Sequence, residues 1–234
     1  MKVLLTCLLC LCYGASMSQE HPKIELENFW FVYFVRGENK ETADDAARAK
    51  AMEGHLGNLN RLVDEGKAVA AGPFEGTQDR RGIVILKGDK FKTKEEVVKE
   101  FANDPFVKAD RLRVEVRKWA TTKGSVKKWK TPEEMKSYVF VVLDLGTERS
   151  PMSDKEGSEL QTAHLKHIFA MKDSGELGIA GPFLEDGEMR GILIFKHKDI
   201  EKAKKLVEQD PLFKADRLRP TYLVLWMAAG IVGD

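Results

Sequence analysis

Residues 108–113 read Lys-Ala-Asp-Arg-Leu-Arg, and the same six residues return at positions 214–219. Shorter matches precede them in the same order. These are His55-Leu56 with His164-Leu165, Gly72-Pro73-Phe74 with Gly181-Pro182-Phe183, and Asp104-Pro105 with Asp210-Pro211. The matched positions lie 109 residues apart in the earlier pairs and 106 apart in the later ones. Collinear matches of this kind predict the same structural unit twice in succession, with three residues fewer in the second copy.

The apolar pattern of the first copy predicts the order βαββαβ. Runs of apolar and β-branched residues predict strands, at residues 29–35, 68–74, 82–86 and 112–119. Apolar residues at a spacing of 3.6 predict helices at residues 42–65 and 93–102. In the first helix, His55 falls on the same predicted stripe as Met52, Leu56 and Leu59, and this stripe is expected to face the sheet. In the second copy, His164 falls beside Leu165 in the same way.

This order indicates an α+β fold built from two ferredoxin-like modules, each a four-stranded antiparallel sheet with two helices on one face. Residues 30–34 are apolar at every position, so both faces of their sheet should be buried. The second copy is the natural cover, which predicts two sheets packed face to face. The predicted boundaries are a signal peptide at 1–18, a first module at 27–120, a linker at 121–136 and a second module at 137–228.

The N-terminus reads as a secretion signal. Lys2 is followed by an apolar run and then by small residues at 14–18, and the run is too short to span a bilayer. We therefore expect a secreted or periplasmic protein whose mature chain has no membrane span. All three cysteines, Cys7, Cys10 and Cys12, lie inside the signal, so a mature chain would have neither disulfides nor thiol chemistry.

The charge balance does not favour nucleic acid as a partner. The chain carries 38 lysines and arginines against 37 acidic residues. A protein that binds polyanions through its overall field should have a clear positive excess. A small-molecule ligand and further oligomerisation remain open as partners.

The ordered motifs resemble the YciI (YCII-related) family. The resemblance covers residues of about 29–120 and 138–227 and rests on His-Leu, Gly-Pro-Phe, Asp-Pro-Phe in the first copy and a closing tryptophan in both. It implies a dimeric α+β barrel, here formed within one chain, and small-molecule enzymes with a His–Asp pair. The implied pairs are His55 with Asp104, and His164 with Asp210.

The residues themselves also permit a structural explanation. A histidine on an apolar helix face is often only a packed core residue, although burial near a carboxylate also suits proton transfer near neutral pH. Asp104 and Asp210 each precede proline, which is typical of the cap and first residue of a short helix. The two roles are compatible for the aspartates. We interpret the charged turn 108–113 as forming salt bridges across the module interface.

Other chemistry receives less support. The Gly-Pro-Phe segments are expected to line the pocket as substrate-binding residues, namely Gly72, Pro73, Phe74, Gly181, Pro182 and Phe183. His164 and His167 have a spacing that suits two metal ligands, but no third ligand is near in sequence, so no metal site is predicted. Nucleotide-binding and Ser-triad motifs are missing. No cofactor is therefore predicted.

Three functions compete on this sequence. The first is an isomerase or lyase in which a histidine acts as general base and its aspartate orients it. The second is a non-catalytic ligand-binding or scaffolding module of the same fold. The third is haem binding, because some two-module α+β barrels hold haem.

Overall fold

The computed structural model describes residues 24–39, 44–76, 78–127 and 134–233. The predicted signal peptide, the three cysteines and the middle of the predicted linker lie outside these residues. The first half contains β1 (Leu26–Arg36), α1 (Asp45–Asp64), β2 (Ala68–Pro73), β3 (Arg80–Lys87), the 3-10 turn η1 (Gly88–Lys90), α2 (Lys94–Phe101), α3 (Pro105–Lys108) and β4 (Leu112–Thr122). The second contains β5 (Met135–Leu145), α4 (Asp154–Asp173), β6 (Leu177–Pro182), β7 (Met189–Phe195), α5 (Ile200–Val207), α6 (Pro211–Lys214) and β8 (Leu218–Ala228).

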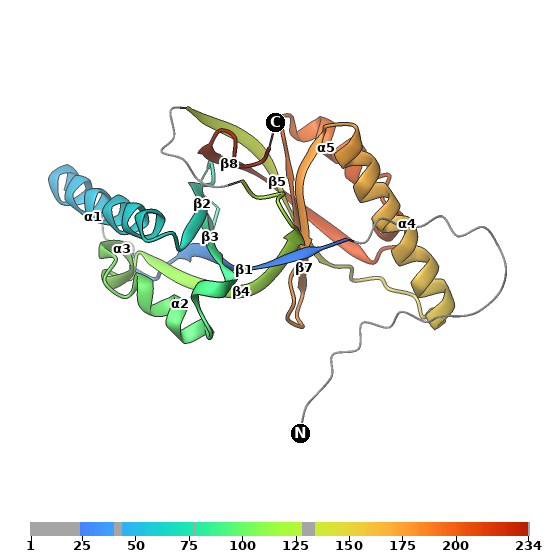
Figure 1. The fold of residues 1–234 in the computed structure, drawn as a ribbon, viewed down its shortest axis with the longest axis horizontal. Coiled ribbons are helices and arrows are strands. Elements are labelled where there is room, and N and C mark those ends of the chain that lie inside the picture. The colour runs from blue at the N-terminus through green and yellow to red at the C-terminus, as the bar shows by residue number, and fades with distance from the viewer. Residues whose placement is uncertain (1–23, 40–43, 77, 128–133, 234) are drawn as a thin grey trace, which may run out of the picture.

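The two halves have the same topology. Each forms a four-stranded antiparallel sheet, in the order β2-β3-β1-β4 and β6-β7-β5-β8. The strands meet in the middle of the molecule, and the helices lie on its two outer sides (Figure 1). The predicted α+β architecture of two ferredoxin-like modules packed sheet to sheet is therefore confirmed. The turn η1 follows β3, whereas β7 leads to α5 without a counterpart of η1, which accounts for the shorter second half.

The strands bury both faces, as the sequence predicts. On β1, Phe29, Phe31 and Tyr33 face the second sheet and belong to the core between the two sheets. Trp30 and Phe34 face the other way and pack with the helices of the first module. A third core lies between the second sheet and its helices. The central core combines aliphatic side chains with eight aromatic ones, and the rings of Phe31 and Phe183 meet edge to face with their centroids 5.6 Å apart.

The two sheets are joined at their edges. Phe74 bridges to Leu225, and Trp119 bridges to Phe183, so the end of each second strand contacts the last strand of the other module. A Cβ atom at Gly72 would collide with the carbonyl oxygen of Trp226, and one at Gly181 would collide with that of Ala120. Glycine is thus required at both seams, since the backbones approach too closely for any side chain.

Helix and strand boundaries differ from the prediction at a few places. Helix α1 begins at Asp45, with Asp44 as its cap, and not at residue 42. Met52 and Leu56 on α1 are 45% and 49% exposed, and Leu165 on α4 is 40% exposed. The predicted inward stripe is therefore wrong at these three positions, which lie on the solvent side of their helices. β4 continues into the predicted linker, where Thr121 Oγ1 donates to Ala180 O at 2.6 Å.

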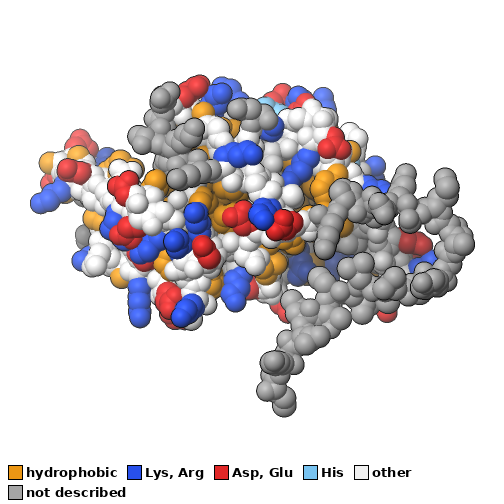
Figure 2. Space-filling view, in the orientation of Figure 1, with side chains coloured by type: hydrophobic (Ala, Val, Ile, Leu, Met, Phe, Trp, Pro, Cys, Tyr) orange, Lys and Arg blue, Asp and Glu red, His pale blue; other side chains and the backbone are white. Residues whose placement is uncertain are grey.

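Two further features are the distribution of surface charge and the hydropathy of the helices. Basic and acidic side chains are interspersed on the face shown in Figure 2. Among the described helices, none combines the length and hydropathy needed to span a bilayer.

Candidate functional site

Each module holds a histidine against a buried aspartate. Nδ1 of His55 on α1 lies 2.6 Å from Oδ2 of Asp104, and Nδ1 of His164 on α4 lies 2.7 Å from Oδ2 of Asp210. The aspartate side chains are 0% and 4% exposed, and the histidines 12% and 13%. The structure therefore brings together both predicted pairs.

The aspartates also cap the short helices, as their sequence context predicts. Oδ1 of Asp104 accepts from the amide of Phe106 at 3.0 Å, and Oδ1 of Asp210 accepts from that of Leu212 at 2.8 Å. Each carboxylate thus uses one oxygen for the cap and the other for the imidazole. Because an ionised carboxylate only accepts, the imidazole donates from Nδ1, and in its neutral form the ring then carries its lone pair on Nε2.

The two imidazoles differ in their surroundings. The His55 ring lies 5.2 Å from the ring of Phe34 and 5.4 Å from that of Phe106. In the second module, Leu212 stands at the position of Phe106, and Leu143 at that of Phe34. The second module therefore has aliphatic residues at the two positions where His55 has aromatic neighbours.

A cavity of about 200 Å³ lies in the second module, and its lining includes residues near the His–Asp pair in sequence but neither His164 nor Asp210. Leu160 and Gln161 line it from α4, one turn before His164, and Leu212 lines it two residues after Asp210. Arg149, Arg190 and Arg217 also line it, and no acidic residue does. These arginines were not predicted as a site from the sequence. Arg190 and Arg217 have counterparts in the first copy, Arg81 and Arg111, and this repetition is the sequence feature that could have indicated them.

The prediction that the repeated charged turn forms salt bridges between the modules is wrong for Arg113 and Arg217. Arg113 pairs with Glu38 of its own module at 3.1 Å, and Arg217 donates to the carbonyl of Ser150, also in its own module. Asp110 and Asp216 in these turns adopt positive φ values of 50° and 52°. Aspartate tolerates this left-handed conformation better than most residues. These turns therefore set the direction of Arg111 and Arg217, which directly precede the last strand of each module.

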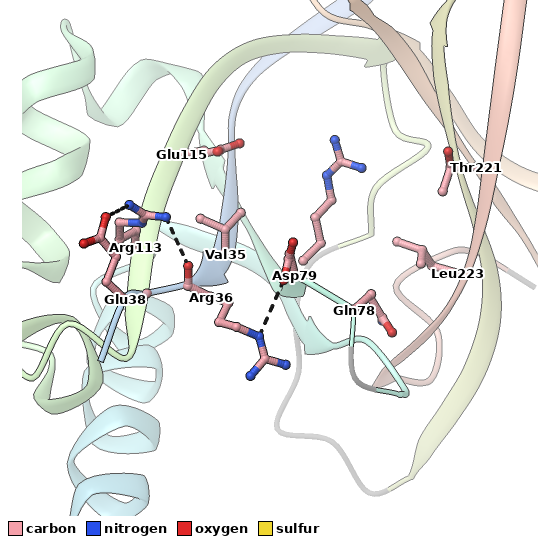
Figure 3. Close-up of a pocket in the computed structure, with 11 residues that line it drawn as sticks. Val35, Arg36, Glu38, Gln78, Asp79, Arg113, Glu115, Thr221 and Leu223 are labelled. Atoms are coloured by element: carbon pink, nitrogen blue, oxygen red, sulfur yellow. Dashed lines mark hydrogen bonds and ion pairs between the residues drawn. The ribbon is translucent and has the colours of Figure 1, made fainter. Parts of the chain in front are cut away.

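A larger cavity of about 770 Å³ lies at one open end of the central core, between the two sheets. Its lining includes Arg36, Arg80 and Arg113 together with Glu38, Asp79 and Glu115 (Figure 3). Arg36 pairs with Asp79 at 3.5 Å, and Arg113 with Glu38. The charges of this lining are balanced and mostly satisfied by one another, so they favour no ligand class.

Tyr33 lies beneath this opening. The Arg80 guanidinium lies 5.4 Å from the centroid of its ring. The Tyr33 hydroxyl is buried without a hydrogen-bond partner among the described residues, and burial raises the pKa of this phenol above its ordinary value. A neutral phenol in the core is a structural feature of the barrel and not an acid–base group near neutral pH.

The Gly-Pro-Phe segments lie at the seams between the sheets. Gly72 and Gly181 make the close backbone approaches, and Phe74 and Phe183 belong to the central core. Pro73 and Pro182 end strands β2 and β6. These segments line neither of the two cavities described above. Their predicted substrate-binding role stays a prediction.

The structure brings together no metal ligands around His167. Nε2 of His167 lies 2.8 Å from the carbonyl oxygen of Leu206 and is engaged there. Over the part of the chain that the structure describes, no group of three or more His, Cys, Asp or Glu side chains is placed to hold a metal ion.

Comparisons with known proteins identify the fold. No protein-family model matches the sequence. No curated protein matches it either. Among solved structures, a novel heme-binding protein from Thermus thermophilus is 16% identical, with a TM-score of 0.54 over 87% of this chain and 93% of its own. A mutant chlorite dismutase from Candidatus Nitrospira defluvii is 11% identical, with a TM-score of 0.57 over 90% and 94%.

At these identities the likeness shows the fold alone. The chain has the fold of a dimeric α+β barrel, with both modules in one polypeptide.

Proposed function

We propose that this protein is a secreted, YciI-like small-molecule isomerase or lyase that transfers protons with a His–Asp pair. The observation that carries the proposal is the geometry of the pairs, with Nδ1–Oδ2 distances of 2.6 and 2.7 Å on largely buried carboxylates. The order of the motifs in both halves supports the YciI-like assignment. The apolar run and small residues at 1–18 support secretion.

The pair supplies a general base with a defined orientation. The aspartate holds the Nδ1–H, so Nε2 takes a proton from a carbon next to a substrate carbonyl. Returning that proton to a different carbon completes an isomerisation, and expelling a leaving group instead completes an elimination. Fixing the tautomer in this way removes the rotational freedom that a surface histidine would retain.

Hydrogen exchange into small keto acids tests this role. In D₂O, the mature chain should replace the α-protons of its substrate by deuterium. Proton NMR measures this exchange for each acid of a panel of small keto acids. The double variant His55→Ala/His164→Ala should lower the exchange rate by about a hundredfold or more, as expected for loss of a general base. His197→Ala, at a histidine outside both pairs, should leave the rate unchanged. Equal exchange by wild type and the folded double variant would overturn the proposal.

The alternative is a non-catalytic ligand-binding or scaffolding module. It is favoured by the cap that each aspartate forms and by the packing of His55 on Phe34 and Phe106, since both are complete structural roles without chemistry. This alternative predicts ligand binding by the wild-type chain without pH-dependent turnover.

Haem binding is not supported by the residues present. His164 has the donor arrangement of an axial ligand, with Nδ1 held by a carboxylate. His164 does not line the cavity of about 200 Å³ in its module, and sites for drug-sized ligands span about 300–1,000 Å³. The cavity of about 770 Å³ has no histidine, cysteine, methionine or tyrosine in its lining to ligate the iron. The purified chain mixed with haem should therefore show no shifted Soret band relative to free haem.

A further inference from the structure

The cavity of about 200 Å³ in the second module differs from the larger one in the charge of its lining. Its lining contains three arginines, Arg149, Arg190 and Arg217, and no carboxylate. None of the three forms an ion pair with a described residue. The guanidinium is planar and matches the two oxygens of a carboxylate or the oxygens of a phosphate. An unbalanced cluster of this kind, in a concave site, favours an anionic ligand.

Arg217 is held in place by one hydrogen bond, but another of its donors has no acceptor. It donates to the carbonyl of Ser150, and the left-handed turn at Asp216 sets its direction. Its Nε is buried and lacks a hydrogen-bond partner among the described residues. A buried donor without an acceptor is unfavourable, so a ligand oxygen that reached this group would relieve the deficit.

The rest of the lining limits the size and character of the ligand. Leu145, Leu160, Leu212 and Leu218 supply apolar surface. The volume of about 200 Å³ equals that of roughly seven liquid waters, at about 30 Å³ each. A small organic acid fits this description better than a nucleotide or a phosphorylated sugar, which would fill the space with polar groups.

Gly157 keeps this space open in the second module. It lies in the first turns of α4 and lines the cavity without a side chain. The first module has Arg48 at the matched position, and Arg48 pairs with Asp45 at 3.3 Å. Together with the change from Phe106 to Leu212, this makes the second module the one adapted to hold a ligand.

We propose that the second module binds a small organic carboxylate in this cavity, with Arg190 and Arg217 on the carboxylate and the apolar part against Leu160 and Leu212. The proposal rests on the proposed function only in treating the bound acid as a substrate, because binding itself requires no turnover.

Benzoate and benzamide, which have nearly the same shape and differ in charge, test the site. Isothermal titration of the full mature chain should show benzoate binding at least tenfold more tightly than benzamide. Arg217→Gln should weaken benzoate binding at least tenfold, whereas Arg111→Gln, its match in the first module, should leave it unchanged. Equal affinity for the two probes, or equal effects of the two arginine variants, would overturn the proposal.

A second variant keeps the test independent of folding defects. A Cβ at Gly157 would meet only the Met152 sulfur at 3.6 Å, an ordinary contact, so Gly157→Leu should fold and fill the cavity. Benzoate binding should then be lost while the circular dichroism spectrum is unchanged, and unaltered binding would count against this site.

The two proposals fail separately. Arginine-dependent binding of benzoate without any histidine-dependent exchange would retain the carboxylate site and remove the proton transfer. Exchange that depends on His164 but not on Arg217 would do the reverse.

Discussion

Asp104 and Asp210 each perform two tasks with their two oxygens. Oδ1 accepts from a backbone amide of the short helix, and Oδ2 accepts from the imidazole. The short helix therefore fixes the carboxylate, and the carboxylate fixes the histidine. The Asp-Pro sequence predicts the first link from local chemistry. The second link joins residues 49 and 46 positions apart, and the resemblance to the YciI family was needed to suggest it.

Asp210→Asn separates the two tasks. Asparagine is as good a cap as aspartate, so the free energy of unfolding should change by less than about 1 kcal/mol, against about 1–2 kcal/mol for Asp210→Ala. With its oxygen on the Leu212 amide, the asparagine presents its NH₂ group to His164, and Nδ1 must then accept. Nitrogen-15 NMR should show the His164 proton move from Nδ1 to Nε2. An unchanged tautomer would show that the carboxylate does not orient the ring.

At the scale of the elements, a network of charges fastens the first two helices together. Glu100 on α2 accepts from Arg61 on α1 at 2.8 Å and from Lys67, just before β2, at 2.6 Å. Burial would raise the pKa of Glu100, but the hydrogen bonds from Lys67 and Arg61 outweigh it and hold this pKa below 4.5. The ionised carboxylate is thus favoured by the folded state.

The stability from this network should depend on pH. Because the folded pKa of Glu100 is depressed, its contribution is full above about pH 4.5 and is lost as the pH falls through the folded value. Glu100→Gln should lower the urea-unfolding free energy by about 1 kcal/mol at pH 7, and the difference should shrink at pH 3. Glu53→Gln, at an exposed position on α1, should have little effect at either pH. A pH-independent difference would contradict this interpretation.

On the scale of the whole molecule, the two glycine seams hold the barrel together. Gly72 and Gly181 admit the backbone of the opposite module, and Trp119 Nε1 donates to Gly181 O at 3.0 Å across one seam. The Gly-Pro-Phe motif, predicted from the sequence to bind substrate, thus has a packing role in both modules. This packing role is enough to explain why the motif occurs twice.

Gly72→Ala should destabilise the protein by about 1–3 kcal/mol, because the added methyl group forces the seam apart. Gly57→Ala is the matched control. A Cβ there meets nothing within 4 Å, and it lies inside α1, where alanine favours the helix by about 0.5–1 kcal/mol. Urea denaturation of both variants measures the contrast. Similar effects of the two substitutions would show that the seam tolerates a side chain.

The sequence by itself determined the order of elements, the strands buried on both faces and the caps at Asp104 and Asp210. These features follow from the spacing of apolar residues and from helix-capping chemistry, which are local properties of the chain. Only the tertiary structure decided which faces of α1 and α4 are exposed, where the glycine seams lie and which arginines line the smaller cavity. Each of these depends on how residues distant in sequence meet, and a repeated motif has the same sequence whether it binds a ligand or a neighbouring strand.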